Sequence, residues 1–262
     1  MDLSLLNKTA VICGSSQGIG FAAAVELAEL GANCILIARN EDSLQQALTH
    51  LPVQAGQQHQ YQVADFTDTP AVEKAIESIV TNQTIHILVN NSGGPKAGLI
   101  EKANVDEFTG AFQQHLINNQ LLVNAVLPGM REANYGRIIN IISTSIKTPL
   151  SGLGVSNTIR AAVAAWAKTL ANEIGEYNIT VNNVLPGLTE TARLSSLVAG
   201  TAAKENKGEA VVAEELKATI PLKRFGTPAE LANVIAFLAS PAAAYVHGAS
   251  IPVDGGRTPS LA

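Results

Sequence analysis

A doubly wound α/β fold is predicted by two features of this sequence. Short apolar runs rich in β-branched residues alternate with longer stretches of helical periodicity, which is typical of βαβ units and a parallel sheet. Several of these runs are apolar throughout, as expected for strands that helices cover on both faces. No repeat or interdomain linker interrupts the pattern. We therefore expect one domain over residues 1–262, with a seven-stranded parallel sheet and helices on both faces.

The elements follow from the apolar runs and the helical periodicity in chain order. The expected strands are Ala10–Cys13, Cys34–Ala38, Gln60–Val63, Ile85–Asn90, Arg137–Ser143, Thr180–Leu185 and Ser250–Val253. The main expected helices are Ile19–Glu29, Pro70–Thr81, Asp106–Met130, Asn157–Ile174 and Pro228–Ala239.

One segment interrupts this alternation. Leu194–Ala218 is rich in Ala, Lys and Glu and lies between the sixth strand and the next long helix, so it predicts one or two short inserted helices. A solvated surface insertion is one interpretation. The other is a small substrate lid at about 192–220, because open α/β sheets bind ligands beyond the carboxyl ends of their strands.

Composition excludes several classes of protein. With 47% hydrophobic and 15% charged residues, the chain is not disordered, and at 262 residues it can bury a full core. No apolar run approaches the roughly 20 residues that span a bilayer. The start, Met1–Leu6, lacks the basic residues of a secretory signal. We expect a cytoplasmic protein that binds no membrane.

Charge and metal-ligating residues exclude further functions. The net charge of −5 argues against a general nucleic-acid surface. Cys13 and Cys34 lie in or beside apolar strands, where small buried hydrophobes are expected. The five histidines show no metal-ligand spacing with cysteines or carboxylates, so no metal site is predicted.

A glycine-rich turn predicts a dinucleotide site. Gly14 follows the first strand, and Gly18 and Gly20 open the next helix. Glycines let the backbone turn sharply and approach a pyrophosphate, and the free N–H groups at the helix start favour its negative charge. The intervening residues of the turn are Ser15, Ser16, Gln17 and Ile19.

Arg39 predicts which dinucleotide is bound. NAD sites commonly carry an acidic residue at the end of the second strand, where it accepts hydrogen bonds from the adenosine ribose. Here that position is Ala38, followed by Arg39, with Ser15 and Ser16 in the nearby turn. No carboxylate repels a 2′-phosphate, and a guanidinium binds one bidentately. The expected cofactor is NADP(H) rather than NAD(H).

These segments together resemble the short-chain dehydrogenase/reductase family, a group with the Rossmann fold, over essentially the whole chain. The resemblance rests on Cys13–Gly20, Asn90–Gly93, the Pro186 and Gly187 pair, and Val253–Gly256. Leu127–Met130, Pro221–Pro228 and Ala236–Ser240 look like β-ketoacyl-acyl-carrier-protein reductases. The resemblance implies an oxidoreductase that reduces a small carbonyl substrate, a 3-oxoacyl thioester or similar ketone.

The resemblance also assigns cofactor contacts. Asp65 is expected at the adenine, Asn91 and Gly93 along the cofactor channel, and Arg160 at the ribose. Pro186, Gly187 and Thr189 are expected to face the nicotinamide, and Thr191 the pyrophosphate.

The catalytic positions depart from the family pattern Tyr-x-x-x-Lys. Ser143 matches the family serine, but Ser156 stands in the tyrosine position and Arg160 in the lysine position. His115 stands where an asparagine is expected. An aliphatic hydroxyl is a far weaker acid than a phenol of pKa about 10, so the usual proton donor is missing. The chain resembles an atypical branch with Ser-Asn-x-x-Arg in this helix.

Two interpretations follow. In the first, the protein is a working reductase in which Ser143 and Ser156 position the carbonyl and His115, with an ordinary pKa of about 6.5, donates a proton through water. In the second, it binds NADP(H) without efficient turnover and has a regulatory or scaffold role.

The resemblance implies a dimer interface formed by two long helices, Asp106–Met130 and Asn157–Ile174, and a second interface at the C-terminal strand that makes a tetramer. Asn157–Ile174 carries many alanines, which permit close approach of another helix. A homotetramer or homodimer is therefore expected.

Overall fold

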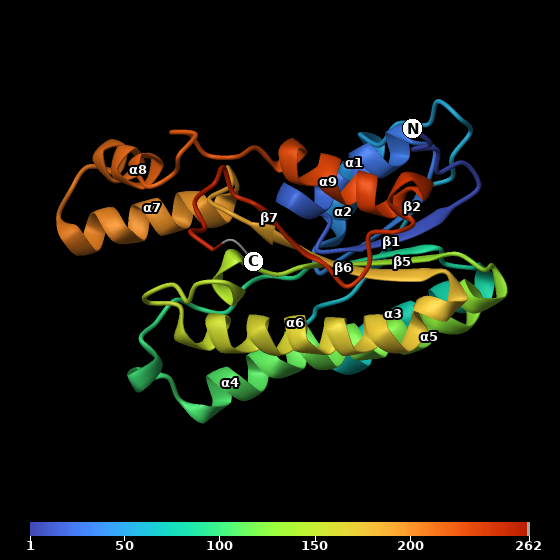
Figure 1. The fold of residues 1–262 in the computed structure, drawn as a ribbon, viewed down its shortest axis with the longest axis horizontal. Helices are drawn as coiled ribbons and strands as arrows, with labels where there is room; N and C mark the ends of the chain where they lie inside the picture. Colours follow the sequence, from blue (N-terminus) through green and yellow to red (C-terminus); the bar gives the residue numbers. More distant parts are fainter. Residues whose placement is uncertain (261–262) are drawn as a thin grey trace.

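The computed structural model describes residues 1–260, and it has the predicted architecture: a seven-stranded parallel sheet in the order β3-β2-β1-β4-β5-β6-β7 between two layers of helices (Figure 1). The last two residues of the expected domain, 261–262, lie outside the described residues. The strands are β1 (Thr9–Cys13), β2 (Asn33–Ala38), β3 (Gln60–Val63), β4 (Ile87–Asn90), β5 (Gly136–Ile141), β6 (Ile179–Pro186) and β7 (Ser250–Val253).

The helices divide between the two faces of the sheet. Helices α1 (Gly18–Glu29), α2 (Glu41–Thr49) and α9 (Pro228–Ala239) cover one face, and α3 (Thr69–Asn82), α4 (Val105–Phe112), α5 (Asn118–Glu132) and α6 (Gly154–Ile174) lie along the other (Figure 1). Because both faces are covered, β1 is buried at every residue, as its uninterrupted apolar run predicts.

The inserted segment forms α7 (Ala192–Glu205) and α8 (Glu209–Ala218), beside the carboxyl end of β6 (Figure 1). Its apolar residues Leu194, Val198 and Val212 form a small cluster of their own, together with Phe225 from the chain after α8. The pair of helices is therefore held together by local packing.

Two expected elements differ from those observed. The long helix expected at Asp106–Met130 is interrupted by a π-helical turn, η2 (Gln113–Ile117), between α4 and α5. The fifth strand ends at Ile141, so Ser143 lies beyond it as the N-cap of a short 3₁₀ turn, η3 (Thr144–Ile146). Helix α2 was not predicted, although Asn40 before Glu41 and Asp42 is a good N-cap signal, and its side chain accepts from the Ser43 N–H.

A ladder of buried amides joins the carboxyl half of the sheet. Asn90 donates to Asn140 (2.8 Å), Asn140 donates to Asn183 (2.9 Å), and Asn183 donates to the Ser250 hydroxyl (3.0 Å). These residues are direct neighbours on β4 to β7. The ladder fixes the relative positions of the strand ends that carry the site described next.

Within residues 1–260, no helix has both the length and the hydropathy needed to span a bilayer.

Candidate active site

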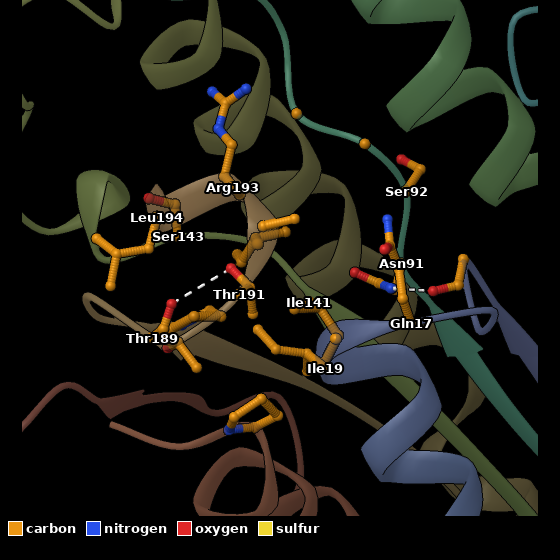
Figure 2. A pocket seen from close by; sticks show the side chains of 18 of the residues that line it. Gln17, Ile19, Asn91, Ser92, Ile141, Ser143, Thr189, Thr191, Arg193 and Leu194 are labelled. Carbon is orange, nitrogen blue, oxygen red and sulfur yellow. Dashed lines mark hydrogen bonds between the residues drawn. The ribbon is translucent and has the colours of Figure 1, made fainter. Parts of the chain in front are cut away.

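A cavity of about 1150 Å³ lies at the carboxyl ends of the central strands (Figure 2). Its walls come from the turn after β1, the ends of β2, β3, β4, β5 and β6, and the starts of α6, α7 and α9. It gathers residues far apart in the sequence, from Gly14 to Arg257. This is the edge at which open α/β sheets bind ligands.

The glycine turn has the geometry of a phosphate cradle. Gly14 and Gly18 have φ angles of 58° and 60°, which favour glycine. A Cβ on Gly20 would lie 2.3 Å from the carbonyl oxygen of Gly14, so a side chain there would push the turn apart. Helix α1 has no side-chain cap and no acidic residue in its first turn. Its N–H groups are therefore free to bind an anion.

Asn91 holds this turn in place. Its amide Nδ2 donates to the carbonyl oxygens of Cys13 (3.2 Å) and Gly14 (3.1 Å). Asn91 follows β4 while the turn follows β1, so one side chain joins two strand ends beneath the cavity.

The turn residues do not all face the cavity. Ser16, Gln17 and Ile19 line it. Ser15 is fully buried, its hydroxyl donates to the carbonyl oxygen of Ile37 at 3.5 Å, and it is absent from the lining. The expectation that Ser15 contacts the cofactor is therefore corrected, because its side chain turns toward β2. Gly20 also lies below the lining and acts through close packing.

Arg39 and Asp65 lie at the end of the cavity formed by β2 and β3. The Thr67 N–H and hydroxyl both donate to Asp65 Oδ1 at 2.9 Å, and this lowers the pKa of the carboxyl, with a further contribution from the charge of Arg39. Arg39 is exposed and makes no hydrogen bond or ion pair with the other described residues. Its guanidinium is available to a ligand.

The two serines face the same cavity. The Ser143 hydroxyl accepts from the Ser145 N–H at 3.1 Å, which leaves its own hydrogen free to donate. Ser156 lies in the first turn of α6, is 9% exposed, and has no hydrogen-bond partner among residues 1–260. Five further residues with expected cofactor contacts also line the cavity: Gly93, Pro186, Gly187, Thr189 and Thr191.

Arg160 is a buried cation in the cavity wall. It is 8% exposed, Nη1 donates to the carbonyl oxygen of Ile141 (2.8 Å), and Nε has no partner. Burial first, and then the nearby charge of Arg193, lower its pKa to about 10. Arg160 thus stays cationic near neutral pH while retaining unused N–H groups.

His115 corrects a sequence expectation. It lies in η2, is 2% exposed, and is absent from the cavity lining. Its Nδ1 lies 2.8 Å from the Ser92 hydroxyl, and Nε2 has no partner. Burial, helped by the charge of Arg160, lowers the pKa of the imidazole to about 3. The expected donor with a pKa near 6.5 is therefore wrong: the ring is neutral near pH 7.

Sequence reasoning missed three residues of this region. Ser92 is the hydrogen-bond partner of His115, Gln114 lines the cavity from η2, and Arg193 enters it from the first turn of α7. Gln114 and Arg193 carry no motif, and only the fold brings them to the cavity.

Comparison with known proteins gives a consistent result. A family model described as Enoyl-(Acyl carrier protein) reductase matches residues 14–258. A 3-oxoacyl-[acyl-carrier-protein] reductase of Pseudomonas aeruginosa is 35% identical over 258 residues, covering 97% of this chain and 98% of that one. The NADPH-dependent reductase BacG of Bacillus subtilis is 27% identical over 256 residues, covering 97% of this chain and 99% of that one.

A solved structure agrees over the full length. The L-sorbose reductase of Gluconobacter frateurii, in complex with NADPH and L-sorbose, has a TM-score of 0.93 and 32% identity, with 100% of both chains covered. From the sheet order, the glycine turn and these matches, the chain belongs to the short-chain dehydrogenase/reductase family.

Proposed function

We propose that this protein is an NADP(H)-dependent carbonyl reductase that acts on a 3-oxoacyl thioester or a similar ketone and lacks the usual tyrosine proton donor. One observation carries the proposal: a single cavity is lined by the glycine cradle, the free guanidinium of Arg39, and the hydroxyls of Ser143 and Ser156. Relatives named as 3-oxoacyl-[acyl-carrier-protein] reductases and as an NADPH-dependent reductase support it.

The residues present fit this cofactor. The positive φ angles of Gly14 and Gly18 and the uncapped start of α1 suit a pyrophosphate. Arg39 suits a 2′-phosphate, because a guanidinium pairs well with phosphate oxygens and no carboxylate occupies that strand end. The N–H groups of Arg160 suit ribose hydroxyls. Thr189 and Thr191 also line the cavity, where Thr189 suits the nicotinamide and Thr191 the pyrophosphate. NADPH, when bound, supplies the hydride.

The protein's own groups act on the carbonyl. The Ser143 hydroxyl, with its oxygen already accepting from Ser145, donates to the carbonyl oxygen. Ser156 provides a second hydroxyl at the cavity wall. Donors held in place before the reaction stabilise the negative charge that develops on that oxygen. The proton that completes the alcohol comes from bulk solvent. A water bound between these hydroxyls gives its proton to the alkoxide and regains one from solvent, since the imidazole of His115 is neutral and lies outside the lining.

A second function is favoured by the composition of the cavity wall. Among residues 1–260, the wall contains no Tyr, His, Lys or Cys. General acid catalysis typically contributes about 10²–10⁴-fold, so its absence predicts slow turnover. The protein would then bind NADP(H) in a regulatory or scaffold role.

The test begins with dinucleotide binding. NADPH and NADH are titrated by fluorescence of Trp166 in the wild type, in Arg39→Ala and in the control Arg131→Ala, which removes an exposed arginine on α5. Arg39→Ala should weaken NADPH binding about 10–100-fold and leave NADH binding unchanged, because it removes only charge-assisted bonds to the 2′-phosphate. Equal loss for both dinucleotides would contradict the assignment of Arg39.

Turnover then separates the two functions. NADPH oxidation is measured with an acetoacetyl thioester and a panel of ketones. Turnover that Ser143→Ala abolishes supports the reductase. Tight NADPH binding without oxidation on any carbonyl supports the non-catalytic role, and binding of neither dinucleotide rejects both.

A further inference from the structure

Two arginine side chains from different walls of the cavity meet at the loop after β4. Arg160 comes from α6 and Arg193 from the first turn of α7. A methyl group placed on Gly94 would lie 3.7 Å from the Nη2 atoms of both arginines, so the two guanidinium ends flank one small space. Figure 2 shows the Arg193 side chain extending from α7 toward the chain that follows Asn91 and Ser92.

Neither arginine forms an ion pair within residues 1–260. Each makes one hydrogen bond, to a main-chain carbonyl: Nη1 of Arg160 to Ile141 (2.8 Å) and Nη2 of Arg193 to Pro95 (3.0 Å). The Nε of Arg160 is buried and unpartnered. The positive charges are thus left without a counter-charge.

The nearest acidic residue in the sequence does not neutralise them. Glu190 lies three residues before Arg193, ahead of the start of α7, but it contributes instead to the raised pKa of Arg224. The charge of Arg193 in turn helps to lower the pKa of Arg160. Two guanidinium groups that disfavour each other's charge are stabilised when an anion lies between them.

The start of α7 adds to the positive potential at this place. Its N-cap, Thr191, makes no side-chain cap, and the first turn contains no acidic residue. The free N–H groups and the helix dipole both favour a negative charge. This agrees with the burial of Arg160 on the opposite wall, which is more than nine-tenths buried and whose Nε has no partner.

We infer that Arg193 and the Nη2 end of Arg160 bind a carboxylate carried by the carbonyl substrate, so that, within the proposed substrate range, the substrate is an oxo acid rather than a 3-oxoacyl thioester or a neutral ketone. The inference rests on the proposed function, because Ser143 and Ser156 of the same cavity then receive the ketone oxygen. A planar guanidinium matches a carboxylate bidentately, which both selects the acid and orients it.

The cofactor pyrophosphate is the competing anion for these groups. Arg160 is shared with the proposed ribose contact, so the variant that separates the two ligands is Arg193→Gln. The matched control is Lys204→Gln, which removes one positive charge from the exposed last turn of the same helix. Arg193→Lys keeps the positive charge but loses the planar guanidinium that can bind a carboxylate bidentately.

The experiment compares acetoacetate with methyl acetoacetate, which share a ketone and differ in the carboxylate charge. Binding to the NADPH-loaded protein is measured by calorimetry, and NADPH oxidation is followed with both compounds. Wild type and Lys204→Gln should bind the acid at least tenfold more tightly than the ester, since charge-assisted bonds contribute that much. Arg193→Gln should lose this preference, Arg193→Lys should keep part of it, and NADPH affinity should change less than twofold.

Two results would overturn the inference: no acid preference in the wild type, or an unchanged preference in Arg193→Gln. A tenfold loss of NADPH affinity in Arg193→Gln, with the acid preference intact, would assign Arg193 to the pyrophosphate instead. Acid preference without NADPH oxidation would support the carboxylate site and reject the reductase function, so the two failures are distinguishable.

Discussion

At the scale of single residues, burial decides the ionisation of His115. A folded-state pKa of about 3, below the ordinary 6.5, means that the unfolded chain takes up this proton first. The resulting stability is fully present above pH 6.5 and is lost as the pH falls from 6.5 toward 3.

The free energy of unfolding should therefore fall with acidification by about 1.4 kcal/mol per pH unit from this one group. His115→Gln should remove that part of the slope, as measured by urea unfolding between pH 7 and pH 4. The control His50→Gln changes an exposed histidine and should leave the slope as in the wild type. Equal slopes in His115→Gln and wild type would show that the ring already accepts a proton in the folded state.

Gly20 acts through the absence of a side chain. A Cβ there would meet the Gly14 carbonyl oxygen at 2.3 Å and Asn91 Nδ2 at 2.8 Å, so Gly20→Ala should open the phosphate turn. We expect NADPH affinity to fall at least tenfold, measured by fluorescence titration. Gly110→Ala is the control, because a Cβ at Gly110 in α4 meets no atom within 4 Å and should stabilise that helix by about 0.5–1 kcal/mol. NADPH affinity unchanged in Gly20→Ala would reject the close-packing role.

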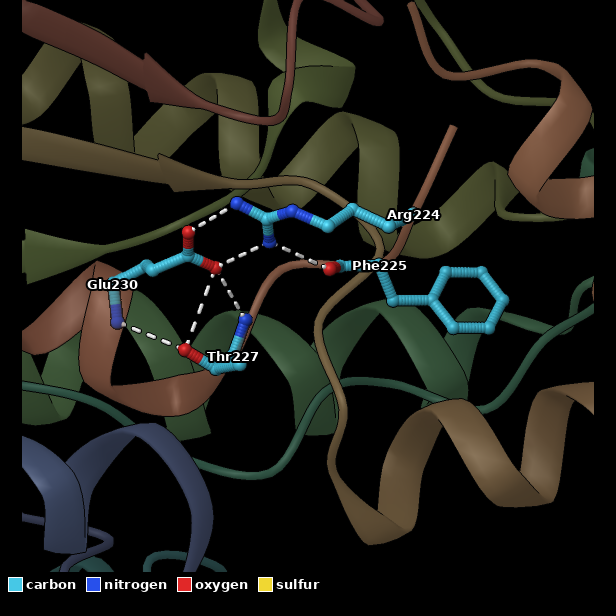
Figure 3. A network of polar contacts seen from close by, with 4 residues as sticks. All are labelled: Arg224, Phe225, Thr227 and Glu230. Atoms are coloured by element: carbon cyan, nitrogen blue, oxygen red, sulfur yellow. Dashed lines mark hydrogen bonds and ion pairs between the residues drawn. The ribbon is translucent and has the colours of Figure 1, made fainter. Parts of the chain in front are cut away.

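At the scale of elements, α9 begins with a capping box that borders the cavity (Figure 3). The Thr227 hydroxyl accepts from the Glu230 N–H, and the Glu230 carboxylate accepts from the Thr227 N–H. Arg224 donates to both carboxylate oxygens. These bonds, those from Arg224 first, lower the pKa of Glu230 to about 2. The carboxylate therefore caps the helix across the whole neutral and mildly acidic range.

Removal of this cap should destabilise the protein modestly. Thr227→Ala should cost about 1 kcal/mol, or roughly 2–4 °C in Tm for a domain of this size. Thr81→Ala, an exposed threonine within α3, should lie within about 0.5 kcal/mol of the wild type. Thermal unfolding by circular dichroism measures both, and equal Tm values for the two variants would contradict the capping role.

The π-helical turn shows why one long helix was expected and two were found. Helical periodicity continues through Gln113–Ile117, so the sequence carries no stop signal there. The partners of this segment lie far away along the chain: Ser92 bonds to His115, Phe66 accepts from Asn118, and Gly93 accepts from Gln114. These long-range hydrogen bonds favour a π-helical turn, which holds one residue more than an α-helical turn. The local sequence pattern carries no information about such distant partners, so it could not predict the interruption.

At the scale of the whole molecule, cofactor binding should be linked to stability. A ligand that binds only the folded state at 100 times its Kd adds about 2.7 kcal/mol to the free energy of unfolding. NADPH should therefore raise the Tm by roughly 5–10 °C, and NADH at the same concentration should raise it less. Differential scanning fluorimetry measures this, with Arg39→Ala as the control in which the two dinucleotides become equal. No shift with either dinucleotide would reject the proposed cofactor.

The homodimer or homotetramer expected from the resemblance stays a prediction. Helix α6 leaves the small residues Ala161 and Ala165 exposed, which is compatible with close packing against a second chain.

The sequence by itself determined the order of strands and helices, the parallel sheet, and the glycine turn with Arg39 beside it. These features depend on hydrophobic periodicity, on the conformational freedom of glycine, and on the residue type at the end of a strand. All three can be read from neighbouring residues in the sequence. The departure at Ser156 and Arg160 from the family pattern Tyr-x-x-x-Lys was inferred from the resemblance and stays a prediction.

Only the tertiary structure decided what several of these side chains face. In the fold, the Ser15 side chain points toward β2, and Arg193 lies beside Arg160. Burial of His115 lowers the pKa of its imidazole, so that the ring is neutral near pH 7. The physical reason is common to all three: the pKa and the contacts of a side chain depend on desolvation and on neighbours from other elements. Those neighbours are separated from it by tens of residues, and folding alone brings them together.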